Sequence, residues 1–437
     1  MSSVIDGGSA SVATEVVAIG EEVAPRGLRQ RFRGTLKLLG PAFVAAVAYV
    51  DPGNFATNFS GGASFGYMLL WVIVVANLMA MLIQTLTAKL GLATGRDLAS
   101  LCRERFPRPV TWGLWVQAEA VAIATDIAEI VGGAIALNLL FSVPLPIGGG
   151  ISALVAFALL MAQTRGYRPF ELVIAGLLAV IGLGFGYTLI RSGVDPVAMV
   201  GGLVPAFNGT ESVLLATGIL GATVMPHVIY VHSALVPNRY PLPPDVARHD
   251  LPATRRQRLL RIQRFDVVVA MGLAGVVNAV MLIIAAQLFF GQDTEVETLE
   301  QVHSSLGAQL GTGAAIAFAV ALLASGLAAS AVGTYAGQIV MAGFLRRRIP
   351  LVVRRLITVV PAIALLSSGA DPTTALIWSQ VVLSFGIPFA LVPLVYLTSR
   401  KDLMGAWVNR PITTVVASIV ATLIIGLNAF LLVNLVG

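Results

Sequence analysis

The sequence contains little charge and almost no cysteine, and both deficits limit what the protein can be. Only 11% of its 437 residues are charged, while 57% are hydrophobic and the mean hydropathy is +0.86. Soluble domains carry roughly 25% charged residues, so a water-soluble globular fold is excluded. The single cysteine, Cys102, excludes an internal disulfide and any zinc site made from paired cysteines.

Other absences narrow the class of function. No glycine-rich phosphate loop stands between a soluble strand and a helix, so ATP-driven pumping has no support. No histidine pair or nucleophile–base set gathers at one depth of a predicted span, so we do not expect an enzyme. Residues 1–37 lack a basic region followed by an apolar core, and we expect a cytoplasmic N-terminal tail there rather than a signal peptide.

Apolar runs recur along nearly the whole remaining chain. Each run is long enough to cross the hydrocarbon core of a bilayer, which is about 30 Å thick. The sequence therefore predicts an all-α polytopic membrane protein. Its eleven expected spans lie near 38–58, 66–92, 111–141, 148–164, 170–190, 211–236, 265–290, 313–345, 355–369, 373–398 and 412–436.

The basic residues predict how these spans are oriented. Of the 28 Lys and Arg residues, all but Lys89 and Arg191 fall in the N-terminal tail or in connections that follow even-numbered spans. Positive charge stays on the cytoplasmic side, so we expect a multi-pass protein of the plasma (inner) membrane with a cytoplasmic N-terminus and an external C-terminus. The net charge of +6 then reflects contact with the lipid bilayer, and no nucleic-acid partner is expected.

Two of the predicted spans carry a helix breaker near their middle. Asp51-Pro52-Gly53-Asn54 interrupts the first span, and Met225-Pro226-His227 interrupts the sixth. A lone proline in a membrane helix most often makes a simple kink. Two breaks at matching positions, each flanked by groups that bind metals, favour a site between two discontinuous helices instead.

The same pattern predicts the organisation of the chain. The two broken spans begin two groups of five spans that start on opposite sides of the membrane, as in an inverted repeat. We expect the first repeat over 38–200, the second over 201–400, and a loop with the eleventh helix over 401–437.

The residue types at the breaks indicate a metal ion as cargo. Asp51 and Asn54 supply oxygen, Met225 supplies a thioether, and the unwound backbone near Ala48 and Ala222 supplies carbonyls. Because Mg²⁺ and Ca²⁺ prefer oxygen alone, a thioether beside oxygens favours softer first-row metals.

These motifs also resemble a known family. Asp51-Pro52-Gly53-Asn54 followed by Phe-Ala-Thr-Asn58, together with Met225-Pro226-His227, is similar to the Nramp (natural resistance-associated macrophage protein) family of divalent-metal transporters, over about residues 38–436. The resemblance implies a LeuT-like fold, import of Mn²⁺ and Fe²⁺, and coupling to protons. It also implies that Asp51, Asn54, Met225, Ala48 and Ala222 bind the metal, with Gln380 joining them in one conformation.

A second set of buried charges predicts a path for protons. Glu119, Asp126 and Glu129 follow one face of the third span, and such acids mark ion or proton pathways. The alternative is a structural network paired with Arg354 or Arg355. The resemblance favours a relay that includes Asp126, Glu129 and Arg355. Asp51 is a further candidate, because a buried carboxylate needs a cation or a proton, and His227 is another, because it follows the second break directly.

Taken together, the sequence predicts a proton-coupled importer of divalent transition metals that works by alternating access. We expect Mn²⁺ or Fe²⁺ and protons as transported ions, no permanently bound cofactor, and a functional monomer. The alternative keeps the LeuT-like architecture and changes the cargo to an amino acid or another small organic solute, coupled to protons or sodium. An ion channel is a weaker hypothesis, because channel function does not account for the inverted repeat.

Overall fold

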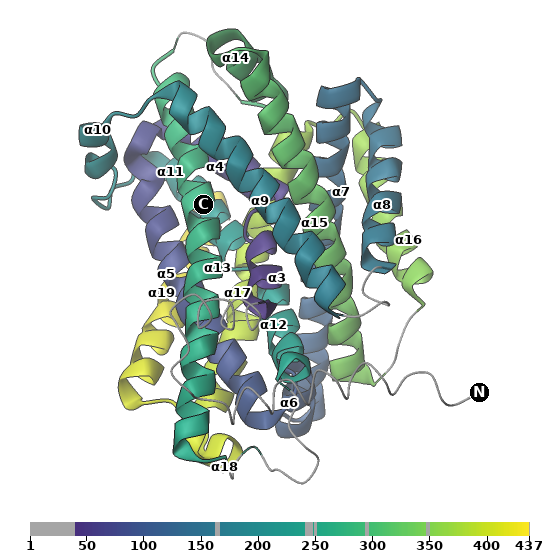
Figure 1. Ribbon diagram of the computed structural model, residues 1–437, viewed down its shortest axis with the longest axis vertical. Coiled ribbons are helices and arrows are strands. Elements are labelled where there is room, and N and C mark those ends of the chain that lie inside the picture. Colours follow the sequence, from purple (N-terminus) through teal and green to yellow (C-terminus); the bar gives the residue numbers. More distant parts are fainter. Residues whose placement is uncertain are drawn as a thin grey trace, which may run out of the picture.

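The structure, a computed structural model, describes residues 40–161, 167–240, 248, 251–292, 297–346 and 350–436, and the expected tail 1–37 lies outside them. Within these ranges the chain forms helices and no strands (Figure 1). The longer helices are α3 (Pro41–Ala48), α4 (Pro52–Phe65), α5 (Leu70–Thr94), α6 (Leu98–Arg105), α7 (Arg108–Phe141), α8 (Leu145–Met161), α9 (Tyr167–Ser192), α11 (Gly209–Thr223), α12 (Pro226–Arg239), α13 (Ala253–Leu288), α14 (Leu299–Leu310), α15 (Thr312–Leu345), α16 (Leu351–Ser367), α17 (Pro372–Ser399) and α19 (Pro411–Val436).

Each predicted span corresponds to one of these helices or to a broken pair. The first span is α3 followed by α4, and the sixth is α11 followed by α12. By length and composition, 8 helical stretches of the described residues can cross a membrane, and one of them, Pro52–Thr94, runs through two predicted spans. The expected all-α membrane fold is therefore confirmed.

The predicted beginning of the seventh span is wrong because its helix starts with charged residues. We expected the seventh span to begin near 265, but α13 begins at Ala253. Its first turns are rich in arginine, which favours helix formation but lowers hydropathy, so an apolar window finds only the part inside the bilayer. The connection between the second and third predicted spans also contains a helix, α6, which buries Cys102 and whose first turn is capped by Asp97.

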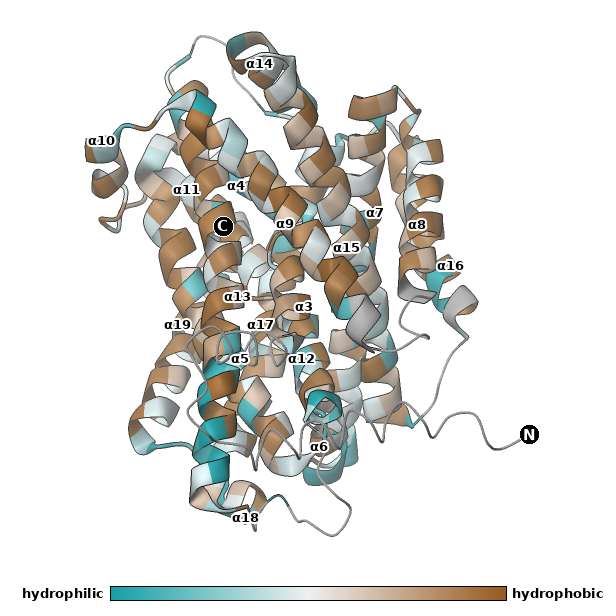
Figure 2. Ribbon diagram, in the orientation of Figure 1, coloured by the Kyte–Doolittle hydropathy of each residue, from teal (hydrophilic) through white to brown (hydrophobic). Residues whose placement is uncertain are grey.

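The polar and apolar surfaces divide along the long axis of the molecule. Figure 2 shows hydrophilic residues gathered at one end, on α6, on the first turns of α13 and on the short helix α18 (Lys401–Met404). Side chains that face outward between the two ends are apolar, such as Leu78, Leu154, Ile190 and Val360, each at least half exposed. Such a belt is stable only against lipid.

Close backbone contacts hold the broken helices in the centre of the bundle. Every residue of α3 except Phe43 is buried. A Cβ atom added to Gly132 of α7 would overlap the ring of Pro52, and one added to Gly221 of α11 would overlap the backbone of Gln380 in α17. Glycine thus lets neighbouring helices approach the two breaks as closely as membrane packing allows.

Candidate functional site

The first break frees one particular carbonyl. In a continuous helix the carbonyl of Ala48 would accept from the N–H four residues later, but that residue is Pro52, which has no N–H. The chain instead tightens, so that the N–H of Tyr49 donates to Ala46 and that of Val50 donates to Val47, both at 3.1 Å. The Ala48 carbonyl is left at the end of α3 without its helical donor.

The second break repeats this chemistry on α11. Four residues before Pro226 stands Ala222, so its carbonyl also loses its helical donor. The side chain of Asn54 replaces it, because Nδ2 of Asn54 donates to the Ala222 carbonyl at 3.1 Å. This hydrogen bond joins the two breaks directly, although they lie far apart in the sequence.

Asp51 lies where the two breaks meet. Its side chain is fully buried and caps α4: Oδ1 accepts from the backbone N–H of Asn54 at 2.8 Å and from Nδ2 of Asn54 at 2.7 Å. Its other oxygen, Oδ2, accepts from Nε2 of Gln380 at 3.2 Å. Among the described residues no lysine or arginine forms an ion pair with Asp51, so its negative charge is held by neutral donors alone.

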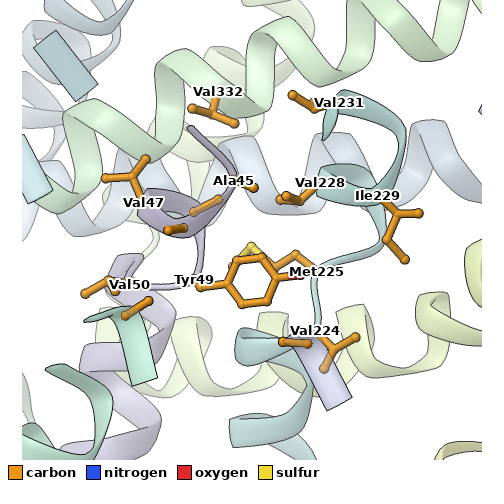
Figure 3. Close-up of a cluster of buried hydrophobic side chains, with 14 of the residues drawn as sticks. Ala45, Val47, Tyr49, Val50, Val224, Met225, Val228, Ile229, Val231 and Val332 are labelled. Carbon is orange, nitrogen blue, oxygen red and sulfur yellow. The ribbon is translucent and has the colours of Figure 1, made fainter. Parts of the chain in front are cut away.

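Met225 lies at the second break and is the residue immediately before α12. Its side chain is fully buried in the bundle and does not face lipid. Figure 3 shows it in one cluster with Tyr49 and Val224, where residues of the two breaks pack together. The thioether therefore lies in the interior, in the interrupted helix that also presents the Ala222 carbonyl.

The structure thus brings together the predicted donors of both broken helices and of α17. Two of their oxygens, Oδ1 of Asn54 and Oε1 of Gln380, are buried and have no hydrogen-bond partner among the residues that the structure describes. In the described part of the chain, no three His, Cys, Asp or Glu residues cluster so as to hold a metal ion. Any ion at this place must use a mixed set of one carboxylate, amides, carbonyls and a thioether, which suits first-row divalent metals better than Ca²⁺ or Mg²⁺.

Two residues that support the first break were not predicted to have this role. Nδ2 of Asn278 in α13 donates to the Tyr49 carbonyl at 2.8 Å, and Oγ of Ser325 in α15 donates to the Val50 carbonyl at 2.5 Å. An asparagine or a serine within an apolar span is also typical of close helix packing, so the sequence alone does not distinguish this role. These bonds fix the direction in which the backbone of the break points.

A buried polar chain also leads away from Tyr49. Nε2 of Gln84 donates to the Tyr49 hydroxyl at 2.6 Å, and Oε1 of Gln84 lies 2.8 Å from Nδ1 of His232. His232 in turn lies 3.3 Å from Gln263 through its Nε2. The partners of His232 thus come from α5 and α13.

Two of the acids predicted to lie on the proton path form ion pairs with arginines. Nη1 of Arg355 lies 3.0 Å from Oδ1 of Asp126, and both side chains are buried; Arg355 also donates to Ser330 and Thr334. Arg354 pairs with Glu119 at 2.7 Å. The arginine pairing that we considered as an alternative is therefore present for two of the three acids.

Glu129 differs from these two acids. It is fully buried, and among the described residues no N–H or O–H group donates to either of its oxygens. Asp51, Asp126 and Arg355 lie within its electrostatic range. His227 is also buried, with Nδ1 3.4 Å from Oγ1 of Thr125, and its Nε2 has no hydrogen-bond partner in the described part of the chain. The charge of Glu129 is thus within reach of both the first break and the Asp126–Arg355 pair.

Comparison of the sequence with known proteins gives one consistent family. The model of the family described as natural resistance-associated macrophage protein-like matches residues 42–434. The chain is 51% identical over 404 residues to the divalent metal cation transporter MntH of Bacillus subtilis, covering 92% of this chain and 93% of that protein. It is 52% identical over 410 residues to the protein of the same name from Mycobacterium tuberculosis H37Rv, covering 93% and 94%.

Comparison of the folds agrees with the sequence. The chain matches the crystal structure of the Eremococcus coleocola manganese transporter with a TM-score of 0.81 and 32% identity, covering 93% of this chain and 88% of that one. It also matches Mhp1, a nucleobase–cation symporter, with a TM-score of 0.57 at 16% identity, covering 86% and 82%. The second likeness shows the fold alone, and together the two confirm the expected LeuT-like fold.

We predict that Arg355→Ala lowers the thermal stability of the purified protein in detergent. The substitution leaves Asp126 buried without its counter-charge, which costs about 3–5 kcal/mol in folded proteins. The melting temperature should fall by several degrees, and Asp126→Asn combined with Arg355→Gln should recover part of the loss.

The matched control is Arg105→Ala, which removes an exposed ion pair with Asp402. Exposed pairs contribute about 0–1 kcal/mol, so its melting temperature should hardly change. Equal shifts in the two single variants would show that Arg355 does not stabilise a buried charge.

Proposed function

The chain belongs to the natural resistance-associated macrophage protein-like family, and we propose that it imports divalent transition-metal ions, with Mn²⁺ and Fe²⁺ among them, together with protons. The observation that carries this proposal is the meeting of Asp51, Asn54 and the Ala222 carbonyl at two proline breaks, beside a buried thioether. The transporters named among its relatives support the same cargo.

The hydrogen bonds at the site suggest how a metal ion would be bound. Asn54 donates to Asp51 and to the Ala222 carbonyl through one amide nitrogen, while no described residue donates to its oxygen. A rotation of this amide would turn the oxygen toward an incoming cation and release the other two oxygens to bind it as well. Met225 would complete the shell on the α12 side, the Ala48 carbonyl would join on the α3 side, and Gln380 would enter from α17.

Protons would move along the charges of α7. Glu129 lies between Asp51 and the Asp126–Arg355 pair, so it can exchange a proton with either side. Glu119 with Arg354 continues the path along the same helix. His227, next to Thr125, would line the route where it leaves the break.

The distribution of charge supports an orientation in the plasma (inner) membrane. The arginine-rich first turns of α13 lie at the same end of the molecule as α6 and α18, while α10 (Pro196–Gly201) and α14 lie at the opposite end (Figure 2). Basic segments remain in the cytoplasm, so this end and the N-terminus face inward and the C-terminus faces outward. We further propose two inverted repeats, 38–200 and 201–400, followed by 401–437, acting in one monomer.

Alternating access follows from the enclosure of the site. Asp51, Asn54 and Met225 are all fully buried, so the site is closed toward both faces. A cation can enter or leave only if the helices that enclose the site move. An amino acid or another organic solute would need room for many more atoms beside Asp51, whereas Asp51, Asn54 and Met225 are fully enclosed by their neighbours.

We predict that Asp51→Ala abolishes Mn²⁺ uptake into proteoliposomes and Mn²⁺ binding measured by calorimetry. The substitution removes the only carboxylate among the proposed ligands. Asp371→Ala removes another carboxylate that caps a membrane helix, α17, and serves as the control that should transport normally. Mn²⁺ binding of unchanged affinity in Asp51→Ala would remove Asp51 from the ligand set.

We predict that Met225→Ala retains Mn²⁺ uptake but raises competition by Ca²⁺ or Mg²⁺ about tenfold. Loss of the thioether leaves oxygen ligands alone, and these no longer disfavour hard cations. Met281, which is equally buried but lies on α13, provides a control as Met281→Ala. The same ratio of Ca²⁺ to Mn²⁺ uptake in both variants would show that the sulfur does not select the metal.

We predict that Glu129→Gln separates metal entry from proton entry. A glutamine has nearly the same shape but cannot carry a proton on and off at this position. Uptake of Mn²⁺ driven by a membrane potential should continue, while the fall in internal pH that accompanies it should shrink severalfold. Acidification at the wild-type rate per Mn²⁺ would make Glu129 a structural residue.

A further inference from the structure

The first half-helix, α3, is capped by a residue from another helix. Its cap position is Gly40, which has no side chain to accept a hydrogen bond. The N–H groups of Phe43 and Val44 donate to the Gly40 carbonyl, and Pro41 has no N–H. Of the first turn, only Ala42 and the adjoining Gly40 need acceptors from outside the helix.

Asp266 of α13 supplies both of these acceptors. Its Oδ1 accepts from the N–H of Gly40 at 3.3 Å, and its Oδ2 accepts from the N–H of Ala42 at 3.1 Å. Asp266 is fully buried, and the metal and proton sites described above do not use it. A carboxylate at a helix N-terminus is also favoured by the helix dipole.

A second carboxylate crowds the same helix end. Atoms of the Glu171 carboxylate would lie 2.5–2.8 Å from a Cβ atom at Gly40. Arg239 at the end of α12 also lies within electrostatic range of Asp266. The start of α3 is thus held by a group of charges from three helices, whereas α3 itself carries only apolar side chains.

The other end of α3 is also bound to α13, but at the break. Asn278 of α13 donates to the Tyr49 carbonyl, immediately after α3 ends. Hydrogen bonds from one helix therefore hold α3 at both ends. If the bonds of Asp266 open while that of Asn278 remains, α3 can turn about the break.

The place of α3 connects such a movement with release toward the cytoplasm. The two half-helices on that side of the breaks are α3, with 7 of its 8 residues buried, and α12, with 10 of its 14 residues buried. Of the two, α3 is the shorter, with 8 residues against 14, and its side chains are mostly small. Displacement of α3 opens the path at the smallest loss of packing.

We propose that Asp266 is a positioning residue of the transport cycle that latches α3 over the cytoplasmic exit, and that its two main-chain hydrogen bonds open when the exit opens. Asn278 provides the pivot. This inference rests on the proposed function only for the identity of the ion that passes through the exit. The latch itself depends only on the contact between α3 and α13.

The experiment measures how accessible α3 is to a water-soluble maleimide. Single-cysteine proteins are made in a Cys102→Ala background, with Ala46→Cys in α3 or Ala56→Cys in α4, both at fully buried positions. The proteins are placed in nanodiscs, where both faces are open to reagent, and labelled without any metal. The result therefore does not depend on the cargo, and a failure of Mn²⁺ uptake in the unmodified protein would count against the proposed function alone.

We expect Asp266→Ala to raise the labelling rate of the Ala46→Cys protein about three- to tenfold, as the loss of a helix cap implies, without raising that of the Ala56→Cys protein. Asp266→Asn keeps one oxygen acceptor and should give a smaller rise in this labelling rate. This variant also tests the latch if Asp266→Ala is poorly folded. Asp371→Ala removes a cap of the same type from α17, at 2.6 Å from the N–H of Thr374, and should change neither rate.

Three results would overturn the latch. The labelling rate in α3 could remain unchanged in both Asp266 variants. The rates in α3 and α4 could rise together, which would indicate general loosening of the fold. Finally, Asp371→Ala could raise the rate in α3 as much as Asp266→Ala does.

Discussion

The centre of this protein depends on backbone carbonyls that have lost their helical donors inside a membrane. Pro52 and Pro226 each remove one N–H, and the carbonyls four residues earlier cannot turn to water. The surrounding polar side chains compensate for this loss: Asn54 donates to Ala222, and Asn278 and Ser325 donate to the next carbonyls of the first break. A cation is the natural further partner for such oxygens, because it binds several of them at once without needing a donor geometry.

The same constraint explains why Asp51 can stand at the break. As the cap of α4 it accepts hydrogen bonds from Asn54, so its direction is fixed by its own helix before any ion arrives. A glutamate would reach past the first turn of α4 and lose this cap. The residue that stabilises the interrupted helix is thus also the residue that presents negative charge to the proposed metal. Removing it would affect both roles, which is why binding and uptake need to be measured separately.

Much of this architecture could be predicted from the sequence, because hydropathy and proline positions are local signals. The spans, both breaks and the meeting of Asp51, Asn54, Ala222 and Gln380 follow from short motifs and a known family pattern. Asn278, Ser325 and Asp266 could not be found in this way. Each binds a backbone group more than 200 residues away, at separations of 229, 275 and 226. In the sequence, an asparagine, serine or aspartate that only packs between helices cannot be told from one that hydrogen-bonds to a distant backbone group. The pairing of Asp126 with Arg355 was foreseen as an alternative, whereas the close packing of the Glu129 carboxylate against Gly333 of α15 depends on the tertiary structure.

The balance of charge around Glu129 connects the two proposed ion paths. Glu129 lies within electrostatic range of two other carboxylates, Asp51 and Asp126, and of Arg355, and among the described residues Asp126 is the only one of the three acids that forms an ion pair with an arginine. Two further negative charges in a medium of low dielectric are costly, so at least one must be neutralised by a proton or a cation. A divalent ion beside Asp51 would supply that positive charge and reduce the need for a proton on Glu129. If metal binding favours proton loss in this way, then protonation must by linkage weaken metal binding to the same degree. Coupling between the two ions then needs no shared ligand, only a common group of acids that cannot all remain charged at once.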